Sequence, residues 1–129
     1  MAKFANSLVL DQGPNYIKTN CTKMAVVASY TFGDSYATVT GGANILAEAT
    51  MTSTDFTLAT ATNDRTLTTA AGKSDSSANN TGTASHIVFL DVTGTAVLWV
   101  TEETSGQTIT SGNVVNFPSL VYTAKQPTA

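Results

Sequence analysis

Apolar and polar residues alternate along most of the chain with the period of two that β-strands require. The clearest alternation runs over residues 45–52, where the odd-numbered positions are apolar and the even-numbered ones are mostly polar. Turn-forming residues separate such segments at roughly ten-residue spacing. The pattern predicts about eight strands. They lie within residues 22–30, 45–52, 56–60, 66–71, 84–91, 96–101, 107–110 and 114–123, the last interrupted by Pro118.

The most apolar part of the chain predicts a β-hairpin at the centre of the fold. Two runs, Ile87–Leu90 and Val97–Val100, flank a short turn. We expect Gly94 in that turn to take a positive φ angle. Residues 22–30 are apolar on both faces and predict another central strand, whereas Pro118 indicates an edge position or a bulge.

Helix-forming residues are scarce, because Lys, Arg, Glu and Gln together supply only 12 of the 129 residues. The only predicted helix lies within residues 4–20. Gly13-Pro14 should interrupt it, which leaves two short pieces or one helix near residues 15–20. We expect loops at residues 31–42 and 72–82. The second contains no large apolar residue and predicts a surface loop or a mobile excursion.

These elements predict an all-β fold: an antiparallel β-sandwich, jelly-roll or immunoglobulin-like, of about eight strands with a short N-terminal helix. A chain of 129 residues accommodates one such domain. We expect an N-terminal arm at residues 1–14, the β-sandwich domain at 15–124 and a C-terminal tail at 125–129.

Composition makes the expected surface polar but poorly charged. Only 12% of the residues are charged, whereas 24 Thr and 11 Ser are present. The net charge is −3, whereas proteins that bind nucleic acids usually carry a positively charged surface. No apolar run approaches the roughly 18 residues of a membrane span, and the first residues do not contain the long apolar h-region expected of a signal peptide. We therefore expect synthesis in the cytoplasm and no nucleic-acid or membrane partner.

The chemistry-bearing residues predict no catalytic site, no metal site and no cofactor. Cys21 is the single cysteine and His86 the single histidine, so neither a disulfide nor a multi-histidine metal site can form within the chain. Ser85, His86 and Asp91 lie close in sequence, but neighbours in a strand point to opposite faces. No nucleophile elbow is present. The chain is therefore predicted not to be an enzyme, with Cys21 as a small residue between helix and strand.

Binding to other proteins is the remaining interpretation, because neutral polar side chains can be buried at an interface without desolvating ions. Both ends of the chain offer contact residues. We predict partner-binding roles for Phe4, Leu8, Val9 and Leu10 in the arm and for Tyr122, Lys125 and Pro127 towards the tail. Trp99 with the tyrosines could instead form a glycan-binding platform, although its place in an apolar strand favours a core position.

Four segments resemble a set of small structural proteins of tailed phages. Asn15–Met24 looks like their opening helix and first strand, and Gly82–Asp91 is similar to their central strand. Leu98–Thr101 and Thr110–Pro118 match the second arm of their hairpin and their closing strand. The resemblance covers residues 15–124, and the chain departs from the pattern at Gly13-Pro14 and in the polar stretch 74–80.

The resemblance implies a virion protein. The leading expectation is a capsid decoration or cement protein on the capsid surface, which binds across subunits of the major capsid protein and stabilises the head. A homo-oligomer, dimer or trimer, is expected of such a protein. A neck or tail component and a receptor- or glycan-binding module on the virion remain as alternatives.

Overall fold

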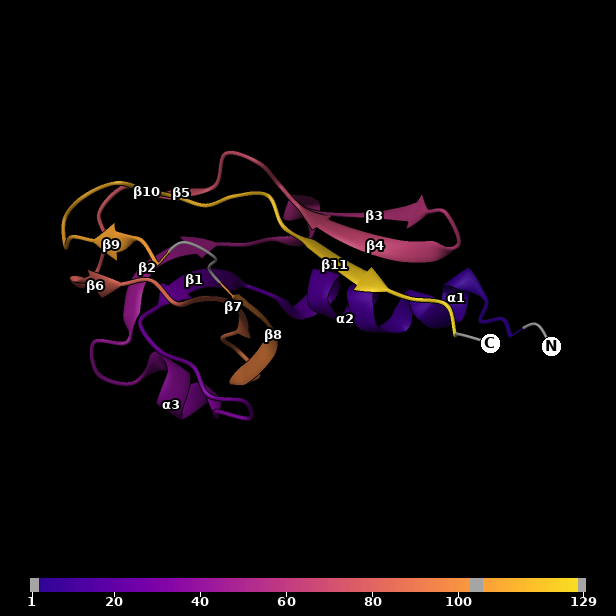
Figure 1. Cartoon of the computed structure of the whole chain (residues 1–129), viewed down its shortest axis with the longest axis horizontal. Coiled ribbons are helices and arrows are strands. Elements are labelled where there is room, and N and C mark those ends of the chain that lie inside the picture. The colour runs from indigo at the N-terminus through magenta and orange to yellow at the C-terminus, as the bar shows by residue number, and fades with distance from the viewer. Residues whose placement is uncertain (1–2, 103–105, 128–129) are drawn as a thin grey trace.

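The computed structural model describes residues 3–102 and 106–127. Figure 1 shows an elongated molecule in which both termini lie at the same end. The helices are α1 (Ser7–Leu10), α2 (Gln12–Asn20) and α3 (Tyr36–Thr40), with a 3-10 turn η1 at Ser53–Asp55. The strands are β1 (Lys23–Val27), β2 (Ile45–Thr50), β3 (Phe56–Ala61), β4 (Asp64–Thr69), β5 (Ser74–Asp75), β6 (Gly82–Thr83), β7 (His86–Asp91), β8 (Ala96–Glu102), β9 (Thr108–Ile109), β10 (Val115–Asn116) and β11 (Val121–Ala124).

The strands form an all-β, sandwich-like fold in which every pairing is antiparallel. The largest sheet has the order β2-β1-β7-β8, and a second sheet has the order β11-β4-β3. Two small ladders, β10-β5 and β6-β9, complete the arrangement. The predicted fold class is confirmed. The strands outnumber the expected eight because β5 and β6 form where no strand was expected and because the expected strand at 114–123 is divided into β10 and β11.

Strands β1 and β7 lie at the centre of the largest sheet and are buried on both faces, which confirms the central strand predicted at residues 22–30. The predicted hairpin forms between β7 and β8, but its second strand, β8, lies at the edge of the sheet. Met24 and Val26 of β1 face a core that includes Ile17 of α2 and Phe56 of β3. Ala25 and Val27 of β1 face a second cluster, which Val39 of α3 covers. Alternate residues of one strand thus enter two separate cores.

Four aromatic side chains connect the two larger sheets. Phe89 of β7 stacks on Trp99 of β8 with ring centroids 4.4 Å apart, and it lies 6.3 Å from Phe56 of β3. Tyr122 of β11 meets Trp99 edge-on at 5.4 Å. Such stacked and edge-on contacts stabilise beyond the area they bury. Trp99 therefore packs against the core, as its apolar strand predicts.

Helix α3 occupies part of the segment 31–42 that we predicted to be a loop. Its β-branched sequence gives little intrinsic helix preference. Two tertiary features override that preference. The hydroxyl of Ser35 accepts a hydrogen bond from the backbone N–H of Thr38 at 3.2 Å, which caps the helix. Val39 is buried against the central sheet.

The N-terminal segment forms two short helices, but the break differs from the predicted one. Gly13 and Pro14 lie inside the first turn of α2, and the interruption falls at Asp11. Proline is tolerated in a first turn because the backbone N–H groups there need no partner within the helix. The expected arm boundary at residue 14 consequently lies within α2.

The polar segment 72–82 is a surface segment that is anchored along β2. The backbone N–H of Glu48 donates to the carboxylate of Asp75 at 2.9 Å. The side-chain amide of Asn80 donates to the carbonyl of Ile45 at 2.7 Å, and Ala78 is buried. Hydrogen bonds rather than large apolar side chains hold this segment, which hydrophobic patterning could not indicate.

Gly94 does not have the positive φ angle that we predicted; Thr95 adopts one instead, at 51°. Glycine at position 94 leaves room for the side chain of Asp91. A Cβ atom there would lie 2.5 Å from a carboxylate oxygen of Asp91. The same carboxylate accepts the backbone N–H of Gly94 at 2.9 Å, so the turn closes around it.

We expect the Cys21 thiol to resist modification until the chain unfolds. Cys21 follows α2 and is only 2% exposed, and burial raises the pKa of its thiol to about 11. The thiolate is the reactive form, so the native protein should react with Ellman's reagent at pH 8 at least about 100-fold more slowly than the urea-unfolded chain. Equal reaction rates would contradict the buried position of Cys21.

We expect Asp55 to contribute stability at neutral pH that is lost in acid. Burial alone would raise the pKa of this carboxyl, but the Thr52 N–H at 2.8 Å and the Lys73 ammonium at 3.3 Å hold the pKa below its usual range. A carboxyl with a lowered pKa stabilises above its unfolded pKa and loses that contribution as the pH falls through the folded value.

The substitution Asp55→Asn tests this linkage through urea unfolding at pH 7 and at pH 3. The wild type should be the more stable protein at pH 7, and the difference between the two proteins should shrink at pH 3. A difference that is the same at both pH values would show that the charge of Asp55 does not matter.

Candidate functional site

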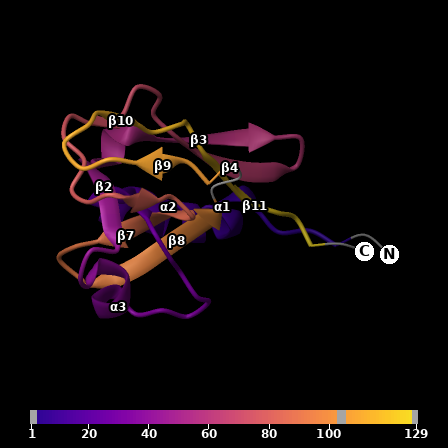
Figure 2. The ribbon, with the colours of Figure 1, turned by 60° about the vertical axis from the view of Figure 1, so that its left-hand side comes forward.

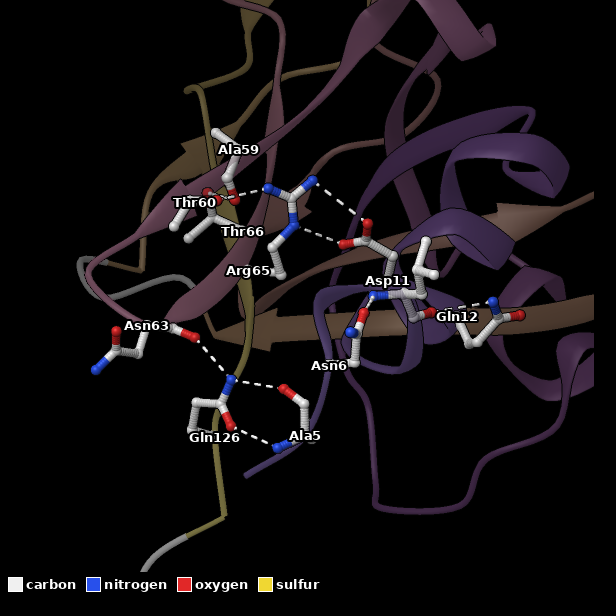
Figure 3. Close-up of polar contacts among 11 residues, drawn as sticks. Ala5, Asn6, Asp11, Gln12, Ala59, Thr60, Asn63, Arg65, Thr66 and Gln126 are labelled. Atoms are coloured by element: carbon white, nitrogen blue, oxygen red, sulfur yellow. Dashed lines mark hydrogen bonds and ion pairs between the residues drawn. The ribbon is translucent and has the colours of Figure 1, made fainter. Parts of the chain in front are cut away.

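The two ends of the chain are joined to each other. Gln126 and Ala5 exchange two hydrogen bonds: the backbone N–H of Ala5 donates to Oε1 of Gln126, and Nε2 of Gln126 donates to the carbonyl of Ala5, both at 2.8 Å (Figure 3). Nε2 also donates to the carbonyl of Asn63 at 3.0 Å. The Gln126 backbone N–H donates to Asp64 at 2.8 Å. Arm and tail are thereby fixed on the turn between β3 and β4.

A bidentate ion pair attaches the helical segment to β4, next to the same turn. The guanidinium of Arg65 in β4 contacts the carboxylate of Asp11 through Nε at 2.7 Å and Nη2 at 3.3 Å. Its third nitrogen, Nη1, donates to the hydroxyl of Thr60 at 2.7 Å (Figure 3). Both charged side chains are 19% exposed. Paired N–H···O bonds of this kind fix orientation as well as distance.

These polar contacts leave the apolar side chains of the arm exposed. No residue of α1 is buried, and Phe4, Leu8 and Val9 are 77%, 72% and 64% exposed. A four-residue helix is too short to be stable by itself. Here it is held by its polar groups, among them the Asn6 side chain that caps it. Clustered exposed apolar residues are typical of protein interaction sites.

A surface hollow of about 570 Å³ lies where the two ends meet. It is lined by Phe4 and Asn6 of the arm, by Asn63 of the turn between β3 and β4, and by Gln126 and Pro127 of the tail. We use the name terminal surface for those predicted contact residues of the two ends that are exposed in the structure. They are Phe4, Leu8, Val9, Lys125 and Pro127.

The structure brings most of the predicted contact residues to one end of the molecule. Leu10 is half-buried, and Tyr122 packs against Trp99, so neither is as free as the others. Sequence reasoning missed Gln126 and Arg65, which join the arm to the domain. Glutamine and arginine are common on any surface, and their partners lie more than fifty residues away, so no local signal indicated these contacts.

Our prediction that Ser85 and His86 point apart is wrong, because Oγ of Ser85 lies 2.8 Å from Nδ1 of His86. Ser85 precedes β7, so the alternation of strand side chains does not apply to this pair. Oγ also lies 3.3 Å from the Val27 carbonyl, which only accepts hydrogen bonds. That carbonyl already accepts the backbone N–H of Ser85 at 2.9 Å, and the tautomer of His86 sets which of Oγ and Nδ1 donates to the other.

Asp91 does not complete a triad with these residues. It lies at the far end of β7 from His86, roughly 16 Å away at the spacing of strand residues. Its carboxylate accepts the Gly94 N–H. Across residues 3–102 and 106–127, no three His, Cys, Asp or Glu side chains gather as metal ligands, and no helix is long and apolar enough to cross a membrane.

The fold defines the chain as an antiparallel all-β protein with sandwich-like layers, and its ends form a candidate surface for binding another protein. Comparisons with protein-family models, with curated proteins and with solved structures find no match.

Proposed function

We propose that this chain is a capsid decoration protein of a tailed phage, which binds across subunits of the major capsid protein through the terminal surface. One observation carries the proposal. The arm and the tail are fixed together by polar contacts, while Phe4, Leu8 and Val9 stay exposed beside them. The resemblance of residues 15–124 to small structural proteins of tailed phages supports the choice of partner.

The physical basis is the burial of a preformed surface. Ordering a free arm during binding would cost conformational entropy. Here the hydrogen bonds of Gln126 and the ion pair of Arg65 have already ordered it. Docking then gains the burial of exposed apolar area. We propose a dimer or trimer as the binding unit, because several weak contacts to neighbouring subunits reinforce each other through effective concentration.

The test is binding to phage heads that lack this protein. A variant carrying Phe4→Ser, Leu8→Ser and Val9→Ser should bind at least about tenfold more weakly, because it loses the apolar contacts of the arm. Val92→Ser with Val114→Ser is the matched control, since both valines are exposed outside the terminal surface. Binding is measured by co-sedimentation with heads and by quantitative mass spectrometry.

The copy number per particle discriminates among the outcomes. A simple ratio to the major capsid protein is expected of a decoration protein, whereas a few copies per virion would indicate the neck or tail. Equal binding by the arm variant and the control would reject the terminal surface as the contact. Absence of the protein from virions would reject the structural role altogether.

A further inference from the structure

Strand β8 forms an open edge of the largest sheet. It pairs with β7 on one side. Among the residues that the structure describes, no other segment forms hydrogen bonds with its backbone. In an antiparallel strand, alternate residues direct their N–H and C=O groups away from the paired neighbour. The opposite edge, β2, is covered by the segment with Asp75 and Asn80, so β8 alone presents a free row of donors and acceptors from this sheet.

A groove runs beside this open edge. Its volume is about 680 Å³, and Figure 2 shows the loop that precedes α3 reaching out past β8. One wall is β8 itself, including Trp99, and the other is the loop with Phe32 and Asp34. His86 and Glu102, which pair across β7 and β8, lie at one end.

The loop holds Phe32 almost completely in solvent, at 99% exposure. The loop is braced by its own hydrogen bonds. The N–H of Thr31 donates to the carboxylate of Asp34, and the N–H of Asp34 donates to the carbonyl of Thr31, both at 2.9 Å. Tyr30 is tilted against His86 at 5.6 Å. These contacts fix the backbone of the loop, so that it presents the exposed Phe32 side chain beside the groove, where a bound chain would cover it.

We propose that β8 accepts an extended segment of a different protein as a fifth strand, and that this segment carries a lysine or arginine. Addition of a strand would satisfy the free backbone groups, while side chains of the segment pack against Phe32. The charge of the groove determines the partner. Asp34 and Glu102 are the acidic residues that line it, and no Lys or Arg does.

The same charge argues against a second copy of this chain as the occupant. Strand β8 itself contains no Lys or Arg and ends in Glu102, so pairing two β8 edges would supply no cation to either groove. The groove also shares no residue with the terminal surface. The inference is therefore independent of the proposed capsid contact.

The experiment is selection from a displayed library of random decapeptides against the full chain, followed by anisotropy measurements with synthetic versions of the enriched peptides. We expect enriched peptides to alternate apolar and polar residues and to carry Lys or Arg. Phe32→Ser should weaken their binding about tenfold, as loss of an aromatic anchor does. Val114→Ser, an exposed apolar control outside the groove, should leave it unchanged.

A charge exchange tests the electrostatic part. Glu102→Lys should weaken the basic peptide about threefold, within the range of an exposed ion pair, and a peptide with Glu in place of its basic residue should regain that loss. Hydrogen exchange should show new protection of β8 backbone amides in the complex, which is the signature of strand addition.

Four results would overturn the proposal. Two concern the peptides: no peptide is enriched, or the enriched peptides bind Phe32→Ser as well as they bind the wild type. A wild-type dimer that Phe32→Ser dissociates would assign the edge to a second copy of the chain, and Phe32-dependent binding of oligosaccharides on a glycan array would assign the groove to a glycan.

Discussion

Replacing Phe89 with alanine should lower the free energy of unfolding by about 3–5 kcal/mol, the usual cost of removing a large aromatic side chain from a core. Phe89 is fully buried and lies between Trp99 and Phe56. Its ring thus contacts both larger sheets. The substitution should leave a cavity at their junction, and urea unfolding followed by circular dichroism measures the loss.

Phe32→Ala is the matched control, because it removes the same ring from a position that is 99% exposed. We expect it to change the free energy of unfolding by less than about 0.5 kcal/mol. Phe89→Leu should fall between the two variants, because it keeps part of the buried volume. Similar losses for Phe89→Ala and Phe32→Ala would contradict the view that the aromatic contacts join the sheets.

Replacing Arg65 with methionine should lower the free energy of unfolding by about 1.5–3 kcal/mol, as expected for loss of a charged hydrogen-bonding partner. The aliphatic part of the side chain is kept, but the carboxylate of Asp11 loses both of its guanidinium contacts while only 19% exposed. The amides of α1 should also exchange faster with solvent, because the ion pair attaches the helical segment to β4.

Two further variants separate charge from geometry in this ion pair. Arg65→Lys keeps the charge but cannot form two parallel hydrogen bonds, so it should recover only part of the loss. A double-mutant cycle with Asp11→Asn should give a coupling energy above about 0.5 kcal/mol. Additive effects would show that Arg65 acts through its packing and not through Asp11.

The strands of the central sheet were predictable because their apolar runs are long and because a short turn joins the two runs of the hairpin. The hairpin of β7 and β8 and the two-sided strand β1 follow from that pattern alone. Helix α3 was not predictable in this way. Its stability comes from the cap at Ser35 and from the burial of Val39, and neither leaves a periodic trace in a five-residue segment.

The candidate contact residues were predictable as exposed apolar positions, but their assembly into one surface was not. The two hydrogen bonds between Ala5 and Gln126 connect residues 121 positions apart. They use a backbone amide group and a side-chain amide, which any chain offers in many places. The groove beside β8 was missed for a related reason, since an open edge depends on strand order rather than on residue type.

The joined ends make circular permutation of this chain feasible. Because Ala5 and Gln126 are in direct contact, a short linker could connect the two ends without moving either. The turn at residues 111–113 is exposed and connects β9 to β10 at the end of the molecule away from the termini (Figure 1). Opening the chain at this turn would place the new termini at the end of the molecule opposite the terminal surface. A cargo protein could then be fused to them without covering Phe4, Leu8 or Val9.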